Sequence, residues 1–287
     1  MYEDYIYGME LKHSKHLCSV TVGYLTAEGA NTISQVKCLK YLTVSELSCK
    51  TLPETISNVW SLQALRVNHS YSLRELPQSI GKLKNCNEIT MLPNSIGKLQ
   101  RLRTLNLSRC EELKSLPDSI GDCQMISSID LCNCEKLTVL PDSIGRNEKL
   151  RVLRLIFTKI ERLPSIITTL RNLECLDLQG SSELVDLPEG IGNLEKLQVL
   201  NLKDCKKLGG MPIGIGQLSR LQKLGLFVVG KGEKFAGISE LANVSRIGEE
   251  LRIKGISHVL DPNDAHMACL KVEIENKLTE VGPKVDD

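Results

Sequence analysis

The sequence predicts a repeat solenoid of the α/β type, in which short parallel strands form one curved sheet. Proline recurs at a nearly constant interval, at Pro53, Pro77, Pro93, Pro117, Pro141, Pro164, Pro188 and Pro212. Each follows Leu except the last, which follows Met211, and the motif L-x-x-L-x-L precedes most of them. Only 3% of residues are aromatic while Leu dominates the apolar positions, so the core is built from one repeated side chain. Such self-similarity is typical of an array of equivalent coils.

Each L-x-x-L-x-L motif predicts a short strand. Within L-x-L the period is two, so both leucines face the core and the residue between them faces outward. Copies one repeat apart pair in parallel, because every coil follows the same path. The predicted strands lie in 17–22, 39–44, 62–67, 102–107, 126–131, 150–155, 173–178, 197–202 and 221–226, the first being a weaker copy without Leu-Pro.

The full unit reads L-x-x-L-x-L-x-x-C/S/T-x-x-L-x-x-L-P-x-x-I-G-x-L-x-x over about residues 17–230. It resembles the leucine-rich repeat, which implies a horseshoe with a parallel concave sheet and an irregular, short-helical convex side. Pro lacks an N–H group, so it belongs on the convex side, where no bond of the sheet is lost. Ile-Gly after it permits a tight corner. The small polar slot, at Cys110, Cys134, Thr158, Ser181 and Cys205, sits where the chain turns inward and can bond the turn.

Eleven cysteines do not indicate a disulfide framework here. Three of them occupy the small polar slot, and their odd total favours reduced thiols. Cys132 and Cys134 form C-x-C, but no second ligand pair follows at zinc spacing, so we expect no metal.

One repeat is short. Pro93 follows Pro77 after 93 − 77 = 16 residues, whereas the other intervals are 23 or 24. Aligning KLKNCNEITMLP with KLQRLRTLNLSRCEELKSLP indicates that the eight missing residues, near 83–93, are the strand itself. Three buried leucine positions are lost, which corresponds to roughly 5–9 kcal/mol. We therefore expect a local defect near 85–90, with Ile89 and Met91 as replacement core residues.

The expected organisation has three parts: an N-terminal extension or cap at 1–16, the repeats at 17–230, and a C-terminal extension at 231–287. The extension is expected to hold one degenerate repeat at 249–254, followed by a flexible tail. A formal net charge of +1 gives no support to binding of nucleic acid or an anionic membrane. We see neither a signal peptide nor an apolar run of the roughly 18–20 residues that a membrane helix needs. The expected location is cytoplasmic, with the nucleus as a second possibility.

No Ser/His/Asp or Cys/His grouping would be brought together by this fold. We therefore expect no enzyme activity and no cofactor. The outward-facing strand positions are where an array of this kind binds. Their charges are mixed in sign, which fits a polar protein ligand better than a phosphate backbone.

Apolar residues stand at a few of these outward positions, and such anchors often carry binding energy at interfaces. A solvated face without a ligand is an open alternative, and for Phe227 so is a role in capping the last coil. The candidate partner-binding residues are Arg66, Asn68, His69, Asn106, Ser108, Arg109, Asp130, Asn133, Arg154, Ile156, Phe157, Asp177, Gln179, Asn201, Lys203, Asp204 and Phe227.

After Leu226 the period ends. The tail, joined to the Leu-Pro-x-x-I-G repeats, resembles plant nucleotide-binding leucine-rich-repeat (NB-LRR) disease-resistance proteins, of the class with a coiled-coil signalling domain. The residues that carry this resemblance are 224–230, GISEL at 237–241, 250–253 and 264–270.

The resemblance implies a role in innate immunity: the array senses pathogen effectors, and restrains a nucleotide-binding switch domain in cis or in trans. Nothing in the chain resembles the coiled-coil or nucleotide-binding domains, and VEIENKLTEVGPKVDD replaces the expected further repeats. The chain thus resembles a truncated receptor. The alternatives are a general intracellular scaffold or adaptor, and a receptor fragment without function.

Overall fold

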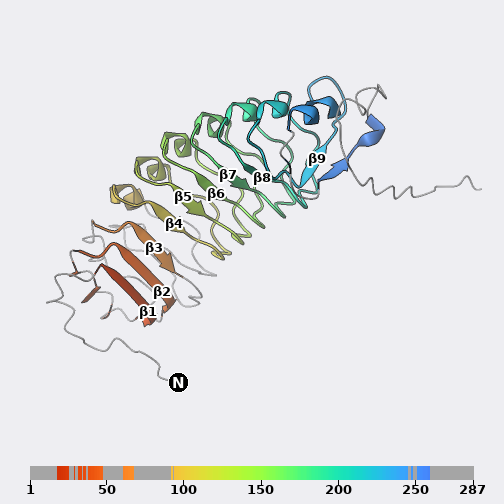
Figure 1. Cartoon of the computed structure of the whole chain (residues 1–287). Helices are drawn as coiled ribbons and strands as arrows, with labels where there is room; N and C mark the ends of the chain where they lie inside the picture. The colour runs from red at the N-terminus through yellow and green to blue at the C-terminus, as the bar shows by residue number, and fades with distance from the viewer. Residues whose placement is uncertain are drawn as a thin grey trace, which may run out of the picture.

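The computed structural model describes residues 18–25, 29, 32–33, 35–36, 38–47, 61–67, 92, 94–244, 247 and 251–258. Over these residues the chain is a solenoid in which strands stack along one side and short 3₁₀ helices along the other (Figure 1). Eight strands form one sheet in chain order, and every neighbouring pair is parallel. The predicted fold is confirmed.

The strands are β1 Ser19–Leu25, β2 Tyr41–Leu47, β3 Ala64–Val67, β4 Thr104–Asn106, β5 Ser128–Asp130, β6 Val152–Arg154, β7 Cys175–Asp177, β8 Val199–Asn201, β9 Leu226–Val228 and β10 Arg252–Lys254. The 3₁₀ helices are η3 Asn94–Lys98, η4 Asp118–Asp122, η5 Asp142–Arg146, η6 Ser165–Thr169, η7 Ile191–Asn193, η8 Ile215–Gln217, η9 Ile238–Asn243 and η10 Ile256–His258. The first eight predicted strands each contain most or all of an observed one.

The strands obey the predicted alternation. The central residues of β4 to β8 have no exposed surface, and these are Leu105, Ile129, Leu153, Leu176 and Leu200. The residues on either side of them in β4, β5 and β7 are half-buried. The side of the sheet that points away from the core, here called the sheet face, therefore carries one outward position before and one after each central residue.

The helical side is shaped by Pro, Ile and Gly, as expected. Pro117 precedes η4 with an extended backbone, and Ile120 inside η4 is fully buried. A Cβ on Gly121 would overlap the carbonyl oxygen of Ser143 in the next coil. Glycine at this position therefore lets successive 3₁₀ helices touch. Among the described residues, no helix has both the length and the apolar character needed to cross a membrane.

The sheet continues across the short repeat. Ala64 of β3 pairs with Thr104 of β4, at a spacing of 104 − 64 = 40 residues. The next pair, Thr104 with Ser128, is 128 − 104 = 24 residues apart. β3 and β4 are thus hydrogen-bonded neighbours although the chain between them is long enough for a further coil. The predicted defect at 85–90, with Ile89 and Met91, lies outside the described residues.

The array changes at its C-terminal end. Val199 of β8 and Lys223 form an isolated bridge, supported by backbone hydrogen bonds such as Leu200 N–H to the Lys223 carbonyl, while β9 pairs with β10. The ninth strand was predicted within 221–226 but begins at Leu226. The cause is Gly225, whose φ of +74° turns the chain at the position where the preceding coils are still extended.

This early turn also changes the position of Phe227, one of the predicted contact residues. We expected Phe227 to lie at the surface, because its distance from Leu226 matches an outward position in other coils. The side chain is instead fully buried and is among the largest in the core. After the left-handed residue at 225 all three residues of β9 are buried, so the alternation of core and surface positions ends there and the prediction for Phe227 was wrong.

Candidate partner-binding surface

In four coils, the outward residue after the central strand residue closes a turn. Its Oδ1 accepts a backbone N–H two residues later, in the pairs Asn106–Ser108, Asp130–Cys132, Asp177–Gln179 and Asn201–Lys203, at 2.9, 3.1, 3.2 and 3.2 Å. Such Asx turns are a known role of Asn and Asp. Our sequence reasoning missed this role, although the recurrence of Asn and Asp at one position was a visible signal. All four residues shape the turn, and Asn106, Asp130 and Asp177 are also partly exposed.

A left-handed corner follows each turn. Arg109, Asn133, Phe157, Gly180 and Asp204 have φ values of 63°, 59°, 54°, 71° and 62°. Glycine takes this conformation freely and Asn and Asp tolerate it, but a bulky aromatic residue there is an outlier. Phe157 is nevertheless 49% exposed. Neither backbone preference nor burial accounts for an aromatic side chain at this corner.

The ring of Phe157 is held in place by the next coil. It lies against Gly180, where any Cβ would overlap its Cδ1 and Cε1 atoms. The backbone N–H of Phe157 donates to the carbonyl of Gln179 at 2.9 Å. On the other side, the carbonyl of the half-buried Ile156 accepts the N–H of Asn133 at 2.7 Å. Phe157 and Ile156 therefore form an ordered apolar patch on the corner between sheet and turn.

Arg154 interrupts the row of turn-forming Asn and Asp residues. It pairs in register with Asp130 on one side and Asp177 on the other. Its Nη1 lies 3.6 Å from Oδ2 of Asp130, and half of its side chain is exposed. Burial raises the pKa of the Asp177 carboxyl, and this is partly opposed by the Gln179 N–H and by nearby cations that include Arg154. The centre of the sheet face thus presents one exposed cation between two partly buried carboxyls.

The other predicted contact residues are distributed as follows. Arg109 and Asp204 are exposed, whereas Asn106, Ser108, Asp130, Asn133, Asp177, Gln179 and Lys203 are half-buried. Asn201 is only 2% exposed, so its expected surface position was wrong. Its Nδ2 donates to Oε1 of Gln179 while its Oδ1 is used by the turn, and Gly225 lies against it. Arg66 lies in β3 and its backbone pairs with Asn106 of β4. The side chain of Arg66, and residues Asn68 and His69, lie outside what the structure describes.

The small polar slot has the role that its position predicted. The thiols of Cys134 and Cys205 donate to the carbonyls of Leu107 and Leu178, both at 3.2 Å. Ser181 donates to the carbonyl of Leu155 at 2.8 Å. Burial raises the pKa of Cys205 to about 12, which leaves this thiol unreactive at neutral pH.

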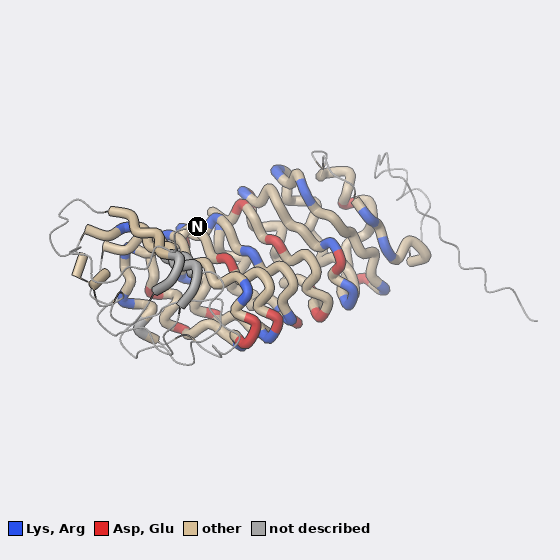
Figure 2. Tube along the Cα trace, turned by 90° about the horizontal axis from the view of Figure 1, so that it is seen from below, with Lys and Arg blue, Asp and Glu red and all other residues tan. Residues whose placement is uncertain are grey.

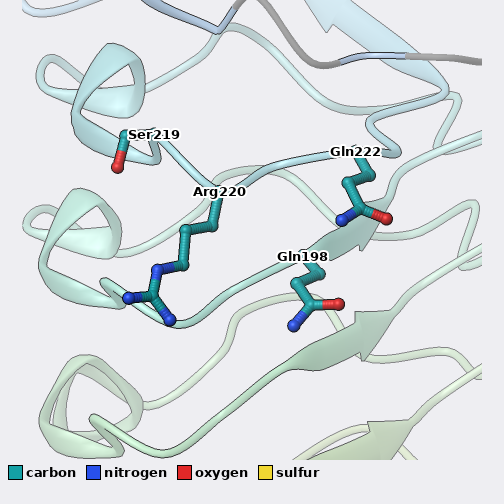
Figure 3. A pocket seen from close by; sticks show the side chains of 4 residues that line it. All are labelled: Gln198, Ser219, Arg220 and Gln222. Atoms are coloured by element: carbon teal, nitrogen blue, oxygen red, sulfur yellow. The ribbon is translucent and has the colours of Figure 1, made fainter.

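Charges on the turns are paired between coils, and Figure 2 shows Lys and Arg interspersed with Asp and Glu along the array. Lys136 lies 2.6 Å from Glu112, and Arg151 lies 2.6 Å from Glu174. A shallow depression of about 460 Å³ lies near β8 and is lined by Gln198, Ser219, Arg220 and Gln222 (Figure 3). Arg220 is its only charged lining residue, and all four side chains reach solvent, so it is a feature of the surface.

Comparison of the sequence with known protein families agrees with the repeated coils of the structure. A model of the leucine-rich repeat region matches residues 121–272, more than half of the chain, and a leucine-rich repeat model matches residues 101–123. The chain belongs to the leucine-rich repeat family. Leucine-rich repeat regions generally act as protein-interaction modules, and no enzyme family matches. No curated protein matches the chain.

Solved structures share the leucine-rich repeat fold. One is the leucine-rich repeat domain of the type III effector XopL, with 24% identity and a TM-score of 0.53 over 71% of this chain and 75% of that chain. Another is TLR13 in its complex with ssRNA13, with 19% identity and a TM-score of 0.50 over 82% of this chain and 39% of that chain. At these identities the likeness extends to the fold alone.

Proposed function

We propose that this chain is the recognition module of a plant innate-immunity receptor. Its partner is a pathogen effector, or a nucleotide-binding switch domain in cis or in trans. The resemblance of the 224–230, 237–241 and 250–253 segments to NB-LRR disease-resistance proteins supports this proposal. The family match also runs to residue 272, past the last Leu-Pro pair. Such a module would act in the cytoplasm or the nucleus.

The contact is centred on the Phe157 surface, defined as Asn133, Arg154, Ile156, Phe157 and Gln179. The observation that carries this choice is an exposed aromatic ring at a left-handed corner, where neighbouring coils place Asn, Gly, Asp or Arg. Aromatic and Arg side chains dominate binding energy at many interfaces. A ring already held by Gly180 loses little entropy on binding.

Capture of a switch domain in leaf cells tests the proposal. The tagged full chain is co-expressed with the nucleotide-binding domain of a plant coiled-coil receptor, and the co-captured domain is quantified. We expect Phe157→Glu to lower capture about tenfold, as loss of an interface anchor does. Val139→Glu is the matched control, because Val139 is 51% exposed and receives the same charge in a different place.

Equal loss in both variants would contradict the Phe157 surface as the contact. Absence of capture by the wild-type chain, with this domain and with a panel of effectors, would contradict the immune role. An immunoblot of source tissue with an antibody to 140–190 then separates the two arrangements. A band near 31.9 kDa indicates action in trans, and a much larger band indicates a switch in cis.

A further inference from the structure

Basic residues surround Gly225, which is an outward position of the sheet face that carries no side chain. A Cβ on Gly225 would lie 2.8 Å from Oδ1 of Asn201 and 3.4 Å from Cβ of Lys203. The carbonyl of Gly225 accepts the backbone N–H of Arg252 at 3.1 Å. Lys223 is two residues before it and bridges to Val199 of β8. Three cationic residues from three successive coils therefore border the same half-buried glycine.

Two of the basic residues lie on the end strand of the array. Arg252 and Lys254 pair in register with Leu226 and Val228 of β9, and all three residues of β9 are buried. Arg252 and Lys254 are exposed, whereas Ile253 between them is half-buried against the core. Lys223 lies close enough to Asp177 to lower the pKa of that carboxyl, against the larger effect of burial.

We propose that this basic end, defined as Lys203, Lys223, Arg252 and Lys254, binds an acidic segment of the partner protein. The inference rests on the proposed function and assigns a second contact to the same partner. Among the described residues, neither Lys203 nor Lys254 forms an ion pair. Among the described residues, the carboxyls on adjoining sheet positions and corners are Asp177 and Asp204, so these two face four basic side chains.

Carboxylates fit this surface better than a nucleic-acid backbone. Ammonium and guanidinium groups donate charge-assisted hydrogen bonds to Asp and Glu side chains. Binding of single-stranded nucleic acid combines such charges with aromatic stacking. The exposed aromatic residues of the described chain are Tyr41 and Phe157, and both lie in other coils. The formal net charge of +1 also provides no wider basic field.

Fluorescence anisotropy with labelled short peptides tests the basic end. At low ionic strength the full chain is expected to bind a peptide of alternating Glu and Ser about tenfold more tightly than one of alternating Gln and Ser. The double variant Lys203→Glu/Lys254→Glu is expected to lose this preference. The control Lys114→Glu/Lys159→Glu makes the same charge change at exposed positions in other coils and is expected to keep it.

Three results of the binding experiment would overturn the inference: no preference for the Glu peptide in the wild-type chain, equal loss in both double variants, or tighter binding of single-stranded oligo-dT. Thermal midpoints of the variants identify losses that stem from unfolding. Phe157→Glu separates this inference from the proposed function. If Phe157→Glu abolishes partner capture while Lys203→Glu/Lys254→Glu leaves capture unchanged, the Phe157 surface stands and the basic end does not contribute.

Discussion

The phenyl ring of Phe157 packs against Gly180 of the next coil, on the side where any other residue would carry a Cβ. Two unusual positions are thereby linked, because both residues have a positive φ. The glycine at 180 leaves room for the ring, and the ring in turn covers the glycine. The pair creates an exposed aromatic anchor whose orientation is set by backbone geometry.

We expect Gly180→Ala to displace the ring and weaken partner capture. A left-handed alanine costs about 1–2 kcal/mol in either case, and the new methyl group would also collide with Phe157. Gly190→Ala is the control, since its φ is 79° but its Cβ would meet only the flexible end of Asn193. Urea unfolding and partner capture are measured on both. Unchanged capture in Gly180→Ala would mean that the ring position does not matter.

Replacing Phe227 and Phe157 by Ala, one at a time, tests which of the two rings is buried. Phe227→Ala is expected to lower the free energy of unfolding by about 3–5 kcal/mol, because it empties a fully buried site. Phe157→Ala is expected to change it by about 0.5 kcal/mol or less, since half of the side chain is in water. Chemical denaturation checks both values. Comparable losses would show that the two sites have been assigned to the wrong sides.

The Asx turns predict a difference between two outward residues that hold the same position in β4 and β6. Asn106→Ala removes the acceptor of the Ser108 N–H and is expected to cost about 0.5–1.5 kcal/mol. Arg154→Ala removes a half-exposed ion pair with Asp130, which is worth less than about 1 kcal/mol. Denaturation midpoints are compared for the two variants. A larger loss of stability in Arg154→Ala than in Asn106→Ala would contradict the turn-forming role of Asn106.

Glu240 of η9, in the GISEL segment, links η9 to η8. Its Oε1 and Oε2 accept the backbone N–H groups of Gly214 and Gly216 at 3.0 and 2.8 Å. Hydrogen bonds to a charged group contribute about 1.5–3 kcal/mol each. In Glu240→Ala we therefore expect faster hydrogen exchange at the amides of Gly214 and Gly216. Glu233→Ala, at an exposed residue nearby in sequence, is the control and should leave both amides protected.

Restoring the missing strand tests the local defect. Wild-type unfolding in urea is expected to occur in more than one step. Insertion of LRTLNLSR between Asn85 and Cys86 is expected to add several kcal/mol, up to roughly 5–9, and to merge the steps. An insertion with Ser in place of each Leu is the control. A single cooperative transition of the wild-type chain, identical by fluorescence and circular dichroism, would contradict the defect.

Sequence periodicity predicted the framework because buried leucines recur with the geometry of a strand. The L-x-L spacing located β1 to β8 and the buried residues Leu105 and Leu153, and the small polar slot located the thiol of Cys134. These features depend on neighbours within one coil and on equivalent positions in the next. Local pattern is sufficient for both, since each coil contacts mainly its neighbours.

Only the tertiary structure decided which outward residues are available to a partner. Asn201 has the same position in its motif as Asn106 but is buried against Gly225 and Gln179. Phe227 was placed at the surface by spacing, but the positive φ of Gly225 turned it into the core. Whether a side chain at a given repeat position is exposed depends on the backbone conformation at the corner of the following coil. Leucine spacing therefore determined the solenoid, while backbone dihedral angles at a few corners determined its candidate binding surface.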